Sequence, residues 1–576
     1  MIATVAPERA AGDAAPVTAA PTEPRRVGWL LLAALVCAFG IRVAIGLTDD
    51  APSTDETAYL RSGVSLVEGD GFERDGRPEL HFPPLVPALL GLGSLVFDDA
   101  HTGAVWLTIL AGTAVVVPLS LLARRVGGAA AGVAAAWIAA LAPAVATSPT
   151  NRGAGSEATY ALLVVLALWW VVDAADHRGR ARGWRVVAAG VAVGLAYLTR
   201  PEGLFVGVPL GIAVVVLARR RGDGADDGDE AGPPRLRSVA LVAAFVVPIL
   251  LCVAPYAAYL HGNTGRWQLT AKTQDASIEA WQAVARADRQ ARDRVLYALD
   301  ETGYGFSTER TSLPALALDD PGGYVVVLRS NVAELAQALV NPTAGQLLAW
   351  LLLPLPVWGL VGLGLWRYRR SRPIQLLVAV AALPVATSLV FFVQPRYLMA
   401  AATLAVVPAA VALAGFAGNV RRWLTAGVVV LLLLSSVQAF EGPGGWWHPA
   451  DHTDQRDAGE WLAAHTDADD RVMTRSMIVG YYAERPTLAI PYADLDRIVD
   501  FGRHYGAQYL VVDWYTVKRL RPQMRELQTD DEVPGLRLVH EVTREGRTTR
   551  IFAFDPAPPK DVPMGPSLGF VGDGTA

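Results

Sequence analysis

The sequence predicts an α-helical, polytopic membrane protein with a small C-terminal α/β domain on its outer face. Of the 576 residues, 52% are apolar and only 18% are charged, whereas soluble proteins carry charge on about a quarter of their residues. The apolar residues gather into runs of roughly 20, the length at which a helix crosses about 30 Å of hydrocarbon. From about residue 441 the pattern changes to short amphipathic and strand-like segments, which are typical of an α/β fold.

The apolar runs predict about eleven membrane-spanning helices. Their expected ranges are 27–47, 102–123, 129–147, 157–174, 186–199, 203–219, 238–260, 345–366, 374–394, 397–417 and 423–440. Residues 1–26 are rich in Ala, Pro and Thr and are expected to form a disordered cytoplasmic tail. A cleaved signal peptide is the competing interpretation of the first run. That run is longer than the apolar part of a signal and leads into further spans, so it is predicted to be an anchor.

Basic residues between the predicted spans indicate the orientation of the chain, because cytoplasmic loops carry an excess of Lys and Arg. If the N-terminus is inside, every basic cluster falls on the cytoplasmic side. These clusters lie at 124–125, 177–185, 219–237, 367–372 and 421–422. The sequence therefore predicts a multi-pass protein of the cytoplasmic membrane, with its N-terminus inside and its C-terminal domain outside.

The outer segments include two long loops. In the first, 48–101, the stretch 82–90 is apolar but short and broken by prolines, so it is expected to lie near the interface rather than to cross. In the second, 261–344, the amphipathic stretches 278–299 and 325–339 are compatible with interfacial helices.

The outer α/β domain is predicted to span residues 441–555. A helical pattern around Ala458 comes first, and a second helix is expected at 495–505. Strands are expected at 471–474, 481–482, 488–490 and 509–513, followed by a hairpin around Glu545-Gly546. Residues 556–576, rich in Pro and Gly, are expected to form a flexible tail.

The composition argues against several kinds of site. The two cysteines, Cys37 and Cys252, each lie inside an apolar run, so a disulfide framework is not expected. No HExxH motif occurs, and Pro449 separates the only histidines that are four residues apart, so no zinc site is predicted. No cofactor and no nucleic-acid partner are predicted. A divalent cation stays open, since Asp55, Glu56 and Glu157 could supply oxygen ligands.

Charged residues from five separate places are predicted to lie at the outer ends of the spans. Any one of them could mark an interface by snorkelling. Arg200 and Arg396, however, each stand in a short turn between two apolar runs, where an arginine requires an anionic partner. The full set is Asp55 and Glu56; His81; Arg152 and Glu157; Arg200 and Glu202; and Arg396 beside Tyr397.

Two kinds of anionic partner are open. In the first interpretation the charges form buried ion pairs, Arg200 with Glu202 or Glu157, and Arg396 with Asp55 or Glu56. In the second, the arginines bind the phosphate of a polyprenyl-phosphate lipid through charge-assisted, bidentate hydrogen bonds. A carboxylate then has a matching role, because it can remove a proton from an acceptor hydroxyl.

Several stretches, in this order, resemble the GT-C superfamily of membrane glycosyltransferases. They are Asp-Glu-Thr-Ala-Tyr-Leu at 55–60, His-Phe-Pro-Pro-Leu at 81–85, residues 152–157, residues 194–204 with Thr-Arg-Pro-Glu-Gly, and Gln-Pro-Arg-Tyr-Leu at 394–398. Residues 505–513 also resemble the C-terminal part of such proteins. The similarity covers most of 27–555 and is to the bacterial branch related to protein O-mannosyltransferases and lipid A aminoarabinose transferases.

The resemblance implies roles for particular residues. Asp55 is the expected catalytic base, with Glu56 as the weaker candidate, and Glu157 matches a second acidic residue. Arg200 and Arg396 are expected to bind the donor phosphate. Further phosphate contacts are predicted for Arg152, His81 and Tyr397, and a contact with acceptor or sugar for Tyr59. Some relatives carry Lys just before the Pro-Pro pair, where this chain has His81 and Phe82, so the role of the mostly neutral His81 stays open.

The predicted reaction is an inverting transfer of a hexosyl or pentosyl group from a polyprenyl-phosphate donor. The acceptor is a hydroxyl of a glycan, lipid or protein at the outer membrane face, and membrane lipids surround the protein. The alternative is a transporter or flippase for a lipid-linked sugar. Transporters place ionisable residues near the midplane and show internal repeats, neither of which is visible here. A receptor-like scaffold is the third possibility, and it leaves the two arginine turns unexplained.

Overall fold

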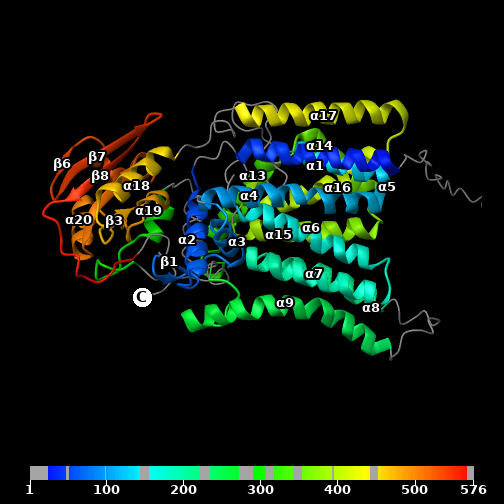
Figure 1. Cartoon of the computed structure of the whole chain (residues 1–576), viewed down its shortest axis with the longest axis horizontal. Coiled ribbons are helices and arrows are strands. Elements are labelled where there is room, and N and C mark those ends of the chain that lie inside the picture. Colours follow the sequence, from blue (N-terminus) through cyan, green and yellow to red (C-terminus); the bar gives the residue numbers. More distant parts are fainter. Residues whose placement is uncertain are drawn as a thin grey trace, which may run out of the picture.

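A computed structural model of the chain shows a helical bundle with an α/β domain at one end (Figure 1). It describes residues 24–46, 51–97, 99–142, 155–219, 234–271, 290–306, 317–340, 353–391, 393, 395–441 and 452–566. Residues 1–23, the greater part of the expected cytoplasmic tail, lie outside the described residues.

Every expected membrane span coincides with a helix in the residues that the structure describes, whereas 143–147 and 345–352 lie outside them. The bundle consists of α1 (Pro24–Gly46), α4 (Ala100–Ala114), α5 (Val116–Leu141), α6 (Ser156–Ala174), α7 (Gly179–Thr199), α8 (Gly203–Arg219), α9 (Pro234–Thr264), α14 (Leu355–Arg367), α15 (Arg372–Val390), α16 (Met399–Ala414) and α17 (Gly418–Glu441). Figure 1 shows most of these helices side by side, with the α/β domain beyond their ends.

The two spans expected at 102–123 and 129–147 are joined by a reversal within α5. Gly128 has φ 79° and ψ −173°, a backbone conformation that strains residues with a side chain. After this turn Gly132 packs back onto the first half of the helix, where a Cβ would lie 3.0 Å from the carbonyl oxygen of Ser120. The pair of glycines at 127–128 thus makes a helical hairpin out of one apolar run.

Seven segments of the described chain are long and apolar enough to cross a membrane, so the protein is a multi-pass membrane protein. One of them, Ala100–Leu141, contains the α5 hairpin. The other expected spans are α7, α8 and α14. Of these, α8 and α14 are shorter, at 17 and 13 residues, and α7 carries three arginines near its start.

The loop 48–101, which is expected on the outer side, contains α2 (Thr54–Glu68), a small hairpin of β1 (Glu73–Arg74) and β2 (Arg77–Pro78), and α3 (Leu85–Ser94). Figure 1 shows α2 running across the ends of the bundle helices. Helices α2 and α3 meet through two glycines, since a Cβ at Gly63 would lie 2.2 Å from the carbonyl oxygen of Pro87. With only 10 residues, α3 is too short to cross a bilayer.

The C-terminal domain is a six-stranded sheet in the order β4-β3-β5-β8-β7-β6. Strands β3 (Arg471–Thr474), β4 (Thr487–Ala489) and β5 (Ala507–Asp513) are parallel, and β6 (Glu532–Val533), β7 (Leu536–Arg544) and β8 (Arg547–Phe554) add antiparallel pairs. The helices are α18 (Thr453–His465), α19 (Met477–Ala483) and α20 (Leu495–His504).

The prediction of a strand at Tyr481-Tyr482 is wrong, because both residues lie in α19. Ser476 caps this helix by accepting a hydrogen bond from the backbone N–H of Val479 at 3.2 Å. Met477 and Tyr481 are four residues apart and therefore share one helix face, and both pack against the cluster that contains Ala58 and Leu60 of α2. The α/β domain thus contacts the membrane domain through α19 and α2.

The α/β domain also includes a part of the loop 261–344. Helix α11 (Ala291–Leu296) and the residues after it join the domain core, in which Tyr297 and Phe306 pack with Phe501. Of the expected interfacial stretch 278–299, residues 278–289 lie outside the described residues, and the rest packs in the α/β domain. The stretch 325–339 lies in α13 (Pro321–Val340), and α13 packs against α15.

Part of the expected flexible tail is held against the domain. The guanidinium of Arg471 donates to the carbonyl oxygens of Lys560, Val562 and Pro563 at 3.0, 2.7 and 3.1 Å. The backbone N–H of Ala489 donates to the carbonyl oxygen of Pro566 at 2.9 Å. Residues 556–566 therefore follow the domain surface, and the rest of the expected tail lies outside the described residues.

A buried charge cluster joins α11 to the sheet, and it leads to a prediction about stability. The Asp293 carboxylate lies 2.9 Å from Arg475 and 3.0 Å from Arg521, and its side chain is only 2% exposed. Removing one member of such a buried group leaves uncompensated charges, so Asp293→Asn is expected to destabilise the domain by about 3 to 5 kcal/mol. Thermal unfolding of the full-length protein in detergent checks this, with the exposed Asp496→Asn as a control that should melt normally.

The same cluster predicts the effect of pH. Burial favours the neutral acid, but Arg475 and Arg521 together hold the pKa of Asp293 below its ordinary value of 3.8. A carboxylate with a lowered pKa in the folded state contributes stability above its ordinary pKa, and this contribution is lost as the pH falls below that value. The melting temperature should therefore drop below about pH 4, and drop less in Asp293→Asn. Equal pH dependence of both proteins would contradict this assignment.

Candidate active site at the ends of the helices

Four short segments bring the predicted site residues together. They are the first turn of α2, the first turn of α6, the turn between α7 and α8, and the 3₁₀ turn η1 (Pro395–Leu398) before α16. The α7–α8 turn is tight, since a Cβ at Gly203 would lie 2.4 Å from the backbone of Ala196. It directs the side chain of Arg200 toward α6 and η1.

Arg200 is buried and is held by partners from its own turn and from α6. Its Nε donates to Glu202 Oε1 at 2.7 Å, and its Nη1 lies 3.1 Å from Ser156 Oγ and 3.2 Å from Glu157 Oε1. The guanidinium also lies over the ring of Tyr397, 4.8 Å from its centroid. The structure thus contains the ion pairs of Arg200 with both acids that the sequence offered.

Arg396 joins η1 to the start of α2. Its Nη1 donates to Asp55 Oδ2 at 2.6 Å, and its Nη2 donates to Tyr397 Oη at 3.1 Å. The Asp55 side chain is 33% exposed, compared with 9% for Arg200 and 5% for Glu157. Of these carboxylates, Asp55 is therefore the one that an incoming molecule can most readily reach.

Tyr59 lies one turn after Asp55 on α2 and is buried beneath the charged groups. Its ring packs edge-on against Phe82, with 4.6 Å between centroids. Burial raises the pKa of Tyr59, the charges of Asp55 and Glu157 raise it further, and Arg200 and a hydrogen bond with Ser156 oppose these effects. The phenol therefore stays protonated and can donate a hydrogen bond in the site.

The turn that carries His81 is fixed by Glu79, a residue that the sequence did not single out. Glu79 Oε1 accepts from the backbone N–H groups of His81 and Phe82 at 2.8 and 3.2 Å, and Oε2 lies 2.8 Å from Arg74 Nε. Glu79 is fully buried. A lone acid just before an apolar, proline-containing stretch is the signal that could have identified it, because buried carboxylates need hydrogen-bonding partners.

Among the described residues, Glu56 has partners other than Arg396, which pairs with Asp55. Its carboxylate contacts His101 on α4 and the backbone N–H of Ser53. Arg152 lies outside the described residues, which resume at residue 155. Ser156 and His101 were also missed, since neither residue type nor local spacing distinguishes them in the sequence. Their contacts with Arg200 and Glu56 join residues more than forty positions apart.

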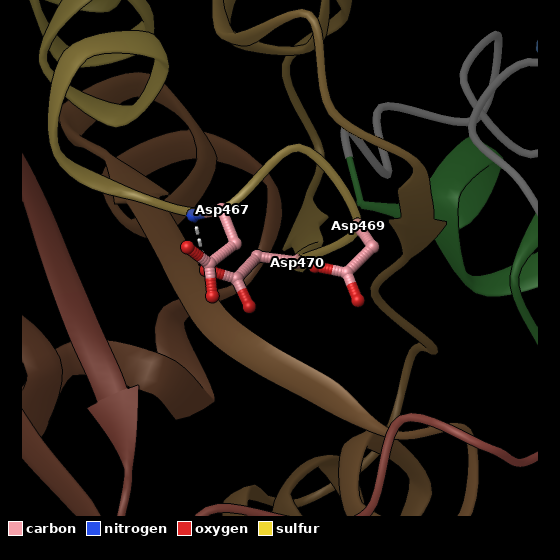
Figure 2. Close-up of side chains that lie close together, drawn as sticks. All are labelled: Asp467, Asp469 and Asp470. Atoms are coloured by element: carbon pink, nitrogen blue, oxygen red, sulfur yellow. Dashed lines mark hydrogen bonds between the residues drawn. The ribbon is translucent and has the colours of Figure 1, made fainter.

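The carboxylates proposed as oxygen ligands have separate partners: Asp55 pairs with Arg396, Glu157 with Arg200, and Glu56 with His101. A different acidic group lies in the loop between α18 and β3, where Asp467, Asp469 and Asp470 come together (Figure 2). The ammonium of Lys560 lies 2.7 Å from both Asp469 and Asp470 and 3.3 Å from Asp467. A single side-chain cation thus contacts all three carboxylates and holds the segment after β8.

The site therefore combines a partly exposed carboxylate, two guanidinium groups and a neutral phenol at the ends of apolar helices. Guanidinium groups suit the oxygens of a phosphate, which they bind bidentately. An accessible carboxylate suits proton transfer from a hydroxyl. Apolar helices directly below the charges suit a ligand whose polar head continues into a hydrocarbon chain.

Residues 81–223 match the sequence family described as dolichyl-phosphate-mannose-protein mannosyltransferase. The matched segment includes His81, Glu157 and Arg200, and it lies between Asp55 and Arg396 without reaching either of them. No curated protein sequence matches the chain.

The structure is similar to several solved membrane enzymes. The Archaeoglobus fulgidus oligosaccharyltransferase in complex with Zn and sulfate shares 14% identity over 84% of this chain and 68% of that chain, with a TM-score of 0.52. ArnT from Cupriavidus metallidurans bound to undecaprenyl phosphate shares 14% identity over 92% of this chain and 98% of that chain, also with a TM-score of 0.52.

A third similar structure is the A. fulgidus oligosaccharyltransferase AglB in complex with an inhibitory peptide and a dolichol-phosphate. It shares 14% identity over 85% of this chain and 70% of that chain, with a TM-score of 0.50. At this level of identity the similarity concerns the fold. The chain has the fold of the GT-C glycosyltransferases, which confirms the predicted fold class.

Proposed function

We propose that the protein transfers a sugar from a polyprenyl-phosphate donor to an acceptor hydroxyl at the outer face of the cytoplasmic membrane. The observation that carries this proposal is the contact of Asp55 with Arg396, next to Arg200 and Tyr397, at the ends of apolar helices. One place thus offers a base for the acceptor and cations for a leaving phosphate.

The proposed reaction is a single displacement that inverts the anomeric carbon. The acceptor oxygen forms a bond to the anomeric carbon while its proton moves to Asp55 Oδ. The bond from the anomeric carbon to the phosphate oxygen breaks, and its electron pair stays on the polyprenyl phosphate. Positive groups aimed at the oxygen where charge develops lower the barrier most, which is the role of Arg200 and Arg396.

In the structure, Arg396 pairs with Asp55. In the proposed complex the donor phosphate competes for this guanidinium, and the Asp55 carboxylate becomes free to accept a hydrogen bond from the acceptor. Arg200 differs, because Glu157, Glu202 and Ser156 already fix its position. We propose that Glu157 acts by holding Arg200, that Tyr59 contacts the sugar or the acceptor, and that His81 contacts the donor phosphate.

Two similar proteins support a lipid-linked donor, since ArnT and AglB were solved with undecaprenyl phosphate and dolichol-phosphate. The test is transfer of a labelled sugar from synthetic polyprenyl-phosphate donors by the purified protein in vesicles. Both hexosyl and pentosyl donors should be offered, with glycan, lipid and peptide acceptors. Movement of the donor across the vesicle membrane without product would favour a transporter and overturn the proposal.

The proposal requires the site to face outward, which predicts the labelling of introduced cysteines. Arg180 at the start of α7 and Asp496 on α20 are both exposed. In intact cells, a membrane-impermeant maleimide should label Asp496→Cys and reach Arg180→Cys only after permeabilisation. The background should have Cys37 and Cys252 replaced by alanine. Labelling of Arg180→Cys in intact cells would show that the start of α7 lies outside, which contradicts the predicted orientation.

A further inference from the structure

Glu56 follows Asp55 directly in the sequence, yet it has different partners. Its side chain is 2% exposed, and that of its partner His101 is 7% exposed. Glu56 Oε1 lies 2.6 Å from His101 Nδ1, and Glu56 Oε2 accepts from the backbone N–H of Ser53 at 3.1 Å. An ionised Glu56 carboxylate would only accept hydrogen bonds, and Nδ1 of His101 would then be the donor in this contact.

These two contacts fix the start of α2 from both sides. Ser53 is the N-cap of α2, and a Glu at the third helical position that bonds back to the N-cap N–H satisfies one of the free donors of the first turn. His101 is itself fixed at the start of α4, where the Asp99 side chain accepts from the backbone N–H groups of His101 and Thr102 at 3.1 and 3.0 Å. Glu56 therefore ties the first turn of α2 to a bundle helix.

Asp55 is on that same first turn, and its carboxylate meets Arg396 of η1. Asp55 directly precedes Glu56 on this turn, so the two contacts of Glu56 limit where the Asp55 carboxylate can stand. Misplacing a reacting group by about 1 Å can cost on the order of 100-fold in rate.

We propose that Glu56 and His101 form a positioning pair that holds the first turn of α2, and thereby Asp55, in register with Arg396. The inference rests on the proposed function and assigns Glu56 a role other than that of an alternative base. Both of its oxygens are engaged with protein groups, and neither it nor His101 touches the reacting atoms.

The decisive comparison is Glu56→Gln against Asp55→Asn in the vesicle transfer assay with the full-length protein. Gln keeps an oxygen for the Ser53 N–H, and its amide N–H can donate to His101 Nδ1 when the ring proton lies on Nε2, so a positioning role predicts a loss of no more than about tenfold in kcat. A base role predicts a loss of about 10²- to 10⁴-fold, as for Asp55→Asn. An equal loss in the two variants would overturn the proposal.

Substitutions of His101 provide the second test of the positioning pair. His101→Phe keeps a ring but removes the donor, and it should lower kcat by about 10- to 100-fold while KM for the donor stays within about twofold. His101→Asn keeps an N–H near the position of Nδ1 and should restore most of the rate. In the Asp55→Asn background, His101→Phe should cause no further loss, because there is then no base left to position.

An unchanged kcat in His101→Phe, or a full additional loss in the Asp55→Asn background, would overturn the positioning pair. If His101→Phe does not fold, the Glu56→Gln and His101→Asn arms still decide. Full activity of Asp55→Asn is a different result. It would refute Asp55 as the base, and the positioning role of Glu56 and His101, which rests on that base, would fall with it. The two failures are thus distinguishable.

Discussion

Asp55→Asn is expected to lower the transfer rate by about 10²- to 10⁴-fold, the range that general base catalysis contributes. Asparagine has nearly the same shape as aspartate, so the first turn of α2 should keep its structure. What is lost is the group that accepts the proton from the acceptor hydroxyl. The variant should bind the donor at least as well as the unmodified protein, because Arg396 no longer has Asp55 as a competing partner.

The assay separates these two effects. Initial rates of transfer in vesicles give kcat, and competition by polyprenyl phosphate without sugar gives the affinity for the lipid phosphate. Asp70→Asn is the matched control, since Asp70 follows α2 in the same loop and is exposed, and its activity should equal that of the unmodified protein. A fully active Asp55→Asn variant would exclude Asp55 as the base.

The sequence was sufficient where the signal is local or is repeated along the chain. Apolar runs located the bundle helices because the hydrocarbon core demands about 20 apolar residues from each span. The pairing of Arg200 with Glu157 and Glu202 was among the stated alternatives, because membrane depth alone brings these residues together. The hairpin at Glu545-Gly546 was also found, since turn residues between two strand-like runs are a short-range signal.

The sequence was insufficient where the contact depends on three-dimensional packing. His101 lies 45 residues from Glu56, and a single histidine in an apolar helix gives no indication of its partner. Residues 290–306 join the α/β domain across more than 140 residues of chain, as the bond of Tyr492 N–H to the Tyr297 carbonyl oxygen shows. Tyr481 was assigned to a strand because aromatic residues favour strands, whereas the Ser476 cap and the contact with α2 make the segment a helix.

The structure gives Asp55 and Glu56 different environments, whereas the sequence left open which of the two is the base. Asp55 is partly exposed and meets Arg396, whereas Glu56 is buried against His101. Consecutive residues on a helix point about 100° apart, so two adjacent acids enter different environments. This division supports Asp55 as the proposed base, and the substitutions at both positions test it.

Arg396→Gln is expected to have the second large effect, a loss of about 10²- to 10³-fold in kcat, as is typical when a group that stabilises developing negative charge is removed. Affinity for the lipid phosphate should fall as well, because the guanidinium would bind this group before and during bond cleavage. Arg396→Lys should recover part of the loss, since lysine restores the charge but not the planar fork that grips two phosphate oxygens.

The choice of Arg396 over Arg200 makes this experiment interpretable. Arg200 is 9% exposed and neutralises Glu157, which is 5% exposed, so removing it would leave a buried charge and endanger folding. Arg396 is 20% exposed and its partner Asp55 is 33% exposed, so the protein should tolerate the change. Arg537 is an exposed arginine on β7, and Arg537→Gln is the control for loss of one positive charge on the α/β domain.

Kinetics can distinguish whether Arg396 binds the donor in the ground state or stabilises the leaving phosphate in the transition state. If Arg396 only bound the donor, Arg396→Gln would raise KM and leave kcat unchanged, whereas stabilisation of the leaving phosphate lowers kcat even at saturating donor. Donors with a better leaving group should be less affected by the substitution, because less charge then needs stabilising on the phosphate. Unchanged kcat and unchanged lipid-phosphate affinity in Arg396→Gln would remove Arg396 from the proposed site and reduce its contact with Asp55 to a structural ion pair.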